Sequence, residues 1–96
     1  MVYYSFEDYK FKGFEKSDTL NKKYNAILLN KKTKKEIRVP FGDSRYGQYK
    51  DSTGLGLYSS KNTLDIEKKK LYRQRHANDL KDGFYSAGYF AWHYLW

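Results

Sequence analysis

The sequence YNAILL at residues 24–29 is followed by NKKTKK at residues 30–35 and by EIRVPF at residues 36–41. In the third segment Ile37, Val39 and Phe41 alternate with polar or proline positions, which is typical of a half-buried strand. Pro40 has no amide proton to donate, so this strand either ends there or lies at the edge of a sheet. The stretch therefore predicts a β-hairpin, and its tip concentrates Lys31, Lys32, Lys34 and Lys35.

The segment before the hairpin predicts a further strand. Aromatic residues nearly alternate with charged ones over residues 3–14, and the alternation shifts phase around Glu7 and Asp8. A shift of this kind indicates a bulge or a turn within an extended segment. Residues 13–21 form a polar connection to the hairpin.

The segment after the hairpin predicts an irregular loop. Residues 42–60 are rich in Gly, Ser, Asp and Tyr. A loop of about 18 residues is longer than most loops inside small domains, which makes it a candidate binding surface or an ordered lid.

A helix is predicted from about Thr63 to Leu80. Asn62 is the expected N-cap, and Asp65 and Glu67 fall in the first turns, where they complement the helix dipole. The expected apolar face of this helix consists of Leu64, Leu71, Tyr72, His76 and Leu80. The helix is expected to end at Lys81-Asp82-Gly83.

Residues 84–96 carry no formal charge when His93 is neutral. A short buried helix that opens near Ser86 is the preferred interpretation, because apolar side chains cover nearly every direction around its axis. A closing strand is the alternative. The segment is too apolar to remain free, so it is either part of the core or a docking surface for another protein.

These patterns predict one small α+β domain, with an antiparallel sheet and two helices. The strands lie in residues 1–41, the Tyr/Gly-rich loop in residues 42–61 and the helices in residues 62–96. A chain of 96 residues has room for one core.

Composition narrows the classes of partner and the compartment. The formal net charge of +8 favours acidic partners, namely nucleic acid, an anionic membrane or an acidic protein. The absence of cysteine excludes disulfides and thiolate metal sites, which favours a reducing compartment or a virion interior. The N-terminal residues lack the pattern of a signal peptide, and no apolar run approaches the roughly 20 residues of a spanning helix.

Groups for catalysis or metal binding are sparse. The two histidines are far apart in sequence, no Gly-x-Ser-x-Gly motif is present, and Gly54-Leu55-Gly56 matches only a fragment of a phosphate-binding loop. We therefore expect no enzyme, no metal and no cofactor. A catalytic function would require four residues to converge: Tyr46, Arg73, Arg75 and His76.

Basic residues interleaved with aromatic ones form the strongest constellation. Cations bind phosphate and rings stack on bases, whereas the structural alternative is that lysines solvate the surface and tyrosines fill a small core. The predicted cationic residues are Lys31, Lys32, Lys34, Lys35, Arg45, Lys68, Lys69, Lys70, Arg73 and Arg75, and the predicted stacking or interface residues are Tyr46, Tyr49, Tyr58, Trp92 and Trp96.

Several short motifs extend over about residues 36–96: Phe41-Gly42, Arg45-Tyr46, Tyr49, Tyr72 with Arg75-His76, Ala87-Gly88 and Leu95-Trp96. Together they resemble a family of small basic proteins encoded by large DNA viruses and bacteriophages. The chain departs from that pattern by an inserted stretch at residues 52–56 and by lacking a tryptophan after Arg75-His76. The resemblance implies a viral origin and a virion or viral-replication context, but no reaction. Together with the lack of a signal-peptide pattern, it predicts a location in the host cytoplasm or the virion and no secretion.

Two functions follow as hypotheses. The first is a non-enzymatic accessory protein that binds the nucleic-acid backbone with little sequence specificity, DNA being favoured over RNA. The second is a minor virion component, or an inhibitor, that docks on a viral or host protein through its aromatic C-terminal segment.

Overall fold

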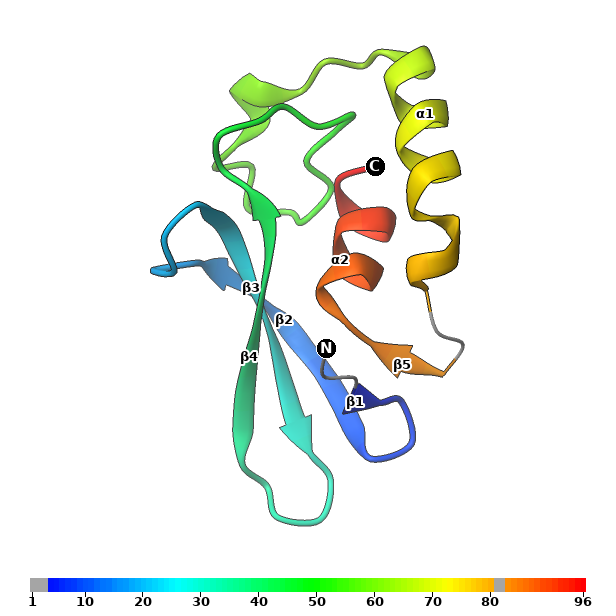
Figure 1. The fold of residues 1–96 in the computed structure, drawn as a ribbon. Helices are drawn as coiled ribbons and strands as arrows, with labels where there is room; N and C mark the ends of the chain where they lie inside the picture. The colour runs from blue at the N-terminus through cyan, green and yellow to red at the C-terminus, as the bar shows by residue number, and fades with distance from the viewer. Residues whose placement is uncertain (1–3, 81–82) are drawn as a thin grey trace.

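The computed structural model describes residues 4–80 and 83–96, and its fold is the expected α+β arrangement (Figure 1). In chain order the elements are β1 (Tyr4–Ser5), β2 (Tyr9–Lys16), β3 (Lys22–Asn30), β4 (Glu36–Asp43), the 3-10 turn η1 (Ser59–Lys61), α1 (Ile66–His76), the 3-10 turn η2 (Ala77–Asp79), β5 (Phe84–Tyr85) and α2 (Ala87–Tyr94).

The predicted hairpin is confirmed as β3 and β4, and β2 completes a three-stranded antiparallel sheet in the order β2-β3-β4. Leu28 lies opposite Ile37 and Tyr24 lies opposite Phe41. The strand β4 does not end at Pro40. It continues to Asp43 as an edge strand, so the second of the two readings of the proline is the one observed.

The N-terminal segment contains both irregularities that its pattern allowed. A turn over residues 6–8 separates β1 from β2, and the register of β2 against β3 shifts between Phe11 and Gly13, as in a β-bulge. Gly13 has a φ of 146°, which few other residues adopt. β1 pairs with β5, and this short two-stranded sheet ties the N-terminal segment to the chain just before α2.

The core lies between the sheet and α2 (Figure 1). Ser86 caps α2 by accepting a hydrogen bond from the amide of Tyr89, so the preferred prediction of a helix opening at Ser86 is confirmed. Alternate residues of β3 and β4 point at this helix, as a period of two requires. The buried hydrophobic side chains are Tyr24, Ala26, Leu28, Val39, Phe41, Phe90, Ala91 and Leu95.

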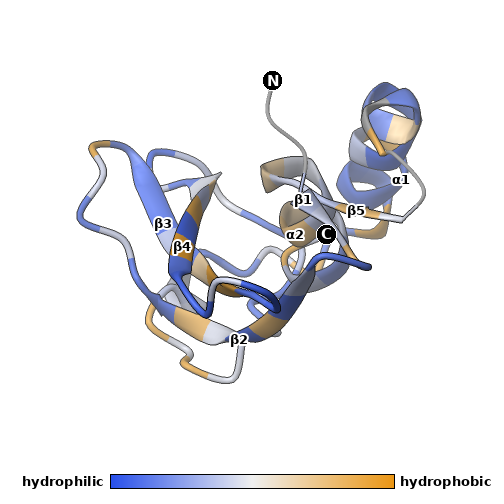
Figure 2. Cartoon of the chain, turned by 90° about the horizontal axis from the view of Figure 1, so that it is seen from below, coloured by the Kyte–Doolittle hydropathy of each residue, from blue (hydrophilic) through white to orange (hydrophobic). Residues whose placement is uncertain are grey.

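The helix α1 differs from the prediction at its start and in its contacts. Its N-cap is Asp65, whose carboxylate accepts hydrogen bonds from the amides of Glu67 and Lys68 at 3.0 and 3.2 Å, so the expectation for Asn62 was wrong. None of its residues is buried, and Figure 2 shows it as a mostly hydrophilic helix beside the more apolar α2. Leu71, assigned to the apolar face, is 55% exposed.

The end of α1 lies partly outside the described residues. The helix passes into η2 at Ala77, and Leu80 follows in extended conformation. Of the predicted stop, Lys81 and Asp82 fall outside the described residues, and Gly83 lies in a turn with a φ of 82°. Within residues 4–80 and 83–96 no helix has the length and apolarity needed to cross a membrane.

Candidate functional site

A polar network holds the long loop against the sheet. The buried ammonium of Lys23 in β3 donates a hydrogen bond to the side-chain carbonyl of Gln48, which is also fully buried. The Gln48 amide donates to the backbone carbonyl of Tyr58 and to the side chain of Asn62, both at 2.8 Å. Buried polar groups with their partners in place rigidify a structure, so this loop is an ordered wall.

The network continues to a carboxylate. Asp51 accepts a hydrogen bond from the hydroxyl of Tyr24 in β3, and its other carboxylate oxygen accepts from the hydroxyl of Thr53 at 2.6 Å. Burial raises the pKa of Tyr24, and the neighbouring Asp51 raises it further. The hydroxyl therefore keeps its proton and remains a donor to the carboxylate.

Lys23 of β3 is the cation that binds this loop, through Gln48. Burial lowers its pKa to about 8, and the nearby charge of Lys61 acts in the same direction, against the carboxylates of Asp43 and Asp51. Gly42 lies beside its stem with a φ of 76°, and a side chain there would reach to 2.8 Å from Leu95. Glycine at this position therefore lets the sheet, the lysine and the C-terminal helix meet.

The ordered loop and the two helices enclose a hollow of about 780 Å³, which we call the α1 cleft. We call its lining residues with the smallest side chains, Gly42, Gly47, Ala87, Gly88 and Ala91, the floor of the cleft. Cationic and aromatic residues also line it. The lining residues are Lys22, Lys23, Gly42, Asp43, Tyr46, Gly47, Thr63, Lys68, Tyr72, Arg75, His76, Ala87, Gly88, Ala91, Leu95 and Trp96.

The α1 cleft carries an excess of positive charge. Lys22, Lys68 and Arg75 line it in addition to Lys23, and Asp43 is the acidic residue among the lining residues. The guanidinium of Arg45 binds this carboxylate at 2.8 and 3.0 Å and holds the pKa of Asp43 at about 2. The carboxylate is thus neutralised by a partner, and the other cations remain to attract an anion.

Aromatic contacts attach α1 to the rest of the protein. Tyr72 of α1 stacks on Trp96, with ring centroids 4.6 Å apart and an angle of 8° between the planes. The guanidinium of Arg73 lies over the ring of Trp92 at 4.8 Å and donates to the carbonyl of Trp96 at 3.2 Å. The ammonium of Lys69 lies over the ring of Tyr49 at 4.3 Å. Two cations predicted for a partner are therefore engaged within the protein.

The other predicted site residues lie in three places. The four lysines of the hairpin tip, residues 31–35, are exposed at the end of the sheet opposite α1 (Figure 1). Lys70 is exposed beside Glu67 at 3.9 Å. Tyr58 packs edge-on against Tyr24 in the interior, with ring centroids 5.3 Å apart. The structure therefore does not gather the predicted cations into one surface.

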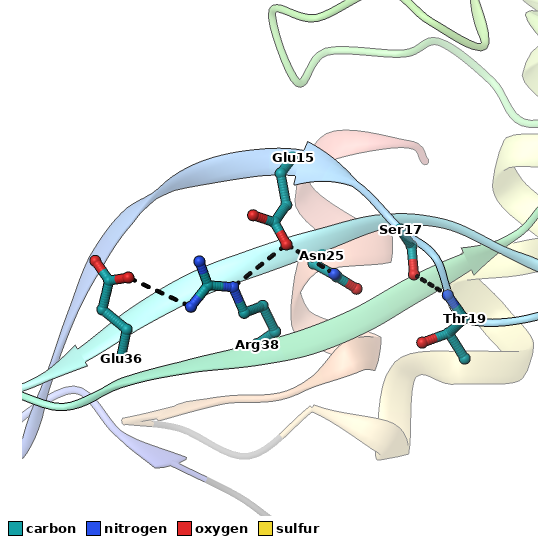
Figure 3. Close-up of polar contacts among 6 residues, drawn as sticks. All are labelled: Glu15, Ser17, Thr19, Asn25, Glu36 and Arg38. Carbon is teal, nitrogen blue, oxygen red and sulfur yellow. Dashed lines mark hydrogen bonds and ion pairs between the residues drawn. The ribbon is translucent and has the colours of Figure 1, made fainter.

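The sheet face turned away from α2 is close to neutral in its central part (Figure 3). The guanidinium of Arg38 lies 3.3 Å from the carboxylates of both Glu15 and Glu36. Glu15 also accepts from the side chain of Asn25 at 2.9 Å, and this bond is the main cause of its lowered pKa. This face offers paired charges, in contrast to the α1 cleft.

Of the residues that a catalytic function would need, three line the α1 cleft and the fourth does not. Tyr46, Arg75 and His76 line it, whereas Arg73 lines a smaller hollow of about 120 Å³ near Tyr49. His76 packs on Tyr72, with ring centroids 4.4 Å apart. Among the described residues no three His, Asp or Glu side chains are grouped as metal ligands would be.

Sequence reasoning missed the residues that shape the α1 cleft. Lys22 and Lys23 precede the predicted strand, and a signal for them existed in the hairpin register, which places Lys22 opposite Asp43. The small residues of the floor left a weaker signal, because Ala87, Gly88 and Ala91 are ordinary constituents of a helix.

Comparison with known proteins adds no relative: no family model, no curated protein and no solved structure matches the chain significantly.

Proposed function

We propose that this protein binds nucleic acid by contacting its phosphate backbone at the α1 cleft, with little sequence specificity and without catalysis. The observation that carries the proposal is the set of cations around the cleft, Lys22, Lys68 and Arg75, beside one carboxylate that Arg45 already binds. Phosphate contacts supply most of the affinity of non-specific nucleic-acid binding.

The position of the cleft also favours this proposal over a general effect of charge. A net charge of +8 steers any polyanion toward the protein. The hairpin tip is cationic as well, but its four lysines line neither of the two hollows described above, and the ammonium of Lys31 donates to the backbone carbonyl of Phe6 at 3.1 Å. A cleft that combines cations with rings offers both phosphate and base contacts.

The test compares two double variants that each remove two positive charges. Lys68→Ala with Arg75→Ala alters the cleft, and Lys32→Ala with Lys35→Ala alters the hairpin tip. Binding of labelled DNA and RNA oligonucleotides is measured by fluorescence anisotropy from low to physiological salt. We expect the cleft variant to lose affinity at least tenfold more than the tip variant and to lower the salt slope by about 2.

The tip variant is the control, because it has the same net charge as the cleft variant. A difference in affinity between the two variants therefore reports the position of the charges. An equal loss in the two variants would show that charge acts without a site and would contradict the proposal. No binding by the wild type at low salt would exclude nucleic acid as the partner.

A second candidate function, docking on a protein, is favoured by a different observation. Leu64, Ile66 and Leu71 are 60, 50 and 55% exposed at and near α1. A protein partner that covered these side chains would remove their apolar surface from water, which favours association. The aromatic C-terminal segment contributes less accessible surface to such docking, because Phe90 and Leu95 are buried in the core.

A further inference from the structure

The floor of the α1 cleft carries no charge, because its residues are alanines and glycines. Ala87, Gly88 and Ala91 come from α2, and Gly42 and Gly47 come from β4 and the loop after it. A larger side chain at Ala87 or Gly88 of α2 would occupy part of this hollow, whereas a Cβ at Gly42 or Gly47 would meet Leu95 or the backbone carbonyl of Lys61. The hollow therefore depends on small residues at the exposed side of α2.

The walls of the cleft offer aromatic faces. On one side Trp96 and Tyr72 lie parallel, and His76 packs on the other part of Tyr72. Tyr46, which also lines the cleft, is 64% exposed, and Arg45 lies 5.5 Å from its ring centroid. Aromatic rings are the groups on which unpaired bases stack.

The volume of about 780 Å³ suits a ligand the size of one or two nucleotides, since sites for small ligands measure roughly 300 to 1,000 Å³. A duplex keeps its bases stacked and paired inside, so proteins read it by inserting a protruding helix or ribbon into a groove. Of the exposed residues of α1, Ile66, Glu67 and Leu71 are poor groups for such a groove, although Lys70 and Gln74 are suitable ones. Its Lys68 and Arg75 line the hollow instead.

From these observations we infer that the α1 cleft takes single-stranded nucleic acid, with one unstacked base lying on the floor of Ala87, Gly88 and Ala91 against the ring of Trp96. The adjoining phosphates lie at Lys22, Lys68 and Arg75. This inference rests on the proposed function and adds the class of nucleic acid and the place of the base.

The first experiment uses the whole chain with Trp92→Phe, which leaves Trp96 as the single tryptophan. Three probes with equal numbers of phosphates are titrated at physiological salt: an oligothymidylate, an abasic strand and a hairpin duplex. We expect the oligothymidylate to quench Trp96 and to bind about tenfold or more tightly than the other two, since stacking of a base on a ring adds affinity that phosphates alone do not.

The second experiment fills the hollow. Gly88→Leu places a large side chain on the floor, and Ala77→Leu makes a comparable change at an exposed position that does not line the cleft. We expect Gly88→Leu to weaken oligothymidylate binding at least tenfold while binding of the abasic strand changes less than twofold. Ala77→Leu should change neither. Circular dichroism verifies that both variants fold. If Gly88→Leu does not fold, the first experiment still tests the inference, because it compares three probes on one protein whose cleft is unchanged.

The outcomes separate the inference from the function on which it rests. Equal affinity for the three probes, with no quenching of Trp96, would overturn the single-strand inference and leave phosphate binding in place. Failure of every probe to bind at low salt would overturn both.

Discussion

The sheet with α2 and the helix α1 are held in the structure by different forces. Among the described residues the sheet and α2 bury eight hydrophobic side chains, whereas α1 buries none. Instead, α1 is attached through a ring stack and two cation-ring contacts. Contacts of that kind each contribute about 0.5–2 kcal/mol.

The difference shows how one small protein separates stability from recognition. Burial of side chains in the core supplies the free energy of folding, whereas a helix without buried residues opens at lower cost than the whole domain. Because α1 forms one wall of the α1 cleft, that wall is less firmly held than the core formed by the sheet and α2.

The largest expected effect is a loss of the packing between the sheet and α2. Phe90→Ala removes a fully buried ring that contacts Phe41 and Phe11, at centroid distances of 5.6 and 5.4 Å. We expect the free energy of unfolding to fall by about 3–5 kcal/mol, because the site loses burial and gains a cavity. Guanidinium unfolding followed by circular dichroism measures it.

Its counterpart on α1 is Leu71→Ala. Leu71 is 55% exposed, so the change in the free energy of unfolding should stay within about 0.5 kcal/mol. If the two substitutions cost the same, the contrast between the two regions is wrong.

A smaller effect concerns the buried lysine. Lys23 has a folded-state pKa of about 8, below the value of about 10.4 for an unfolded chain. Between these values the unfolded chain binds more protons, so the free energy of unfolding rises with pH. From pH 8 to pH 10 the wild type should gain about 2 kcal/mol relative to Lys23→Met.

The measurement is a series of urea titrations of both proteins across that pH range. Taking the difference between the proteins removes the contribution of groups they share, including Tyr24, whose raised pKa acts in the opposite direction above pH 10. Parallel curves for the two proteins would show that Lys23 is not titrating in a buried environment.

A further effect is confined to α1. Asp65→Ala removes the two hydrogen bonds that cap the helix and should destabilise the helix by about 1 kcal/mol. Amide hydrogen exchange should accelerate over residues 67–71, with little change at Leu28 in the sheet. Asp65→Asn should restore most of the protection. Faster exchange at Leu28 in the same variant would mean that the two regions unfold together.

The sequence predicted the hairpin and α2 because each depends on a strong local pattern. Ile37, Val39 and Phe41 alternate on a strand, and Ser86 precedes an apolar helix. The start of α1 was misplaced because Asn62 and Asp65 are both good caps, and the choice between them depends on tertiary contacts. Asn62 is occupied by Gln48 and the amide of Asp51.

The candidate site was predicted only in part for a similar reason. Charge and composition identified Lys68, Arg75, Tyr46 and Trp96, which do line one cleft. They could not show that Lys69 and Arg73 bind rings of the same chain, since residues that distant in sequence meet only in the folded protein. The burial of Lys23 could not be predicted for the same reason, because its partner Gln48 is also distant in sequence.

The two outer strands of the main sheet have a consequence for the behaviour of the protein at high concentration. Exposed strand edges with unbroken rows of amides and carbonyls recruit further strands and start aggregation. Here the edge strand β4 contains Pro40, which presents no amide, and the edge strand β2 is interrupted by the irregularity between Phe11 and Gly13. Both edges therefore resist edge-to-edge addition of another chain, and this protects a small, tyrosine-rich protein from forming fibrils.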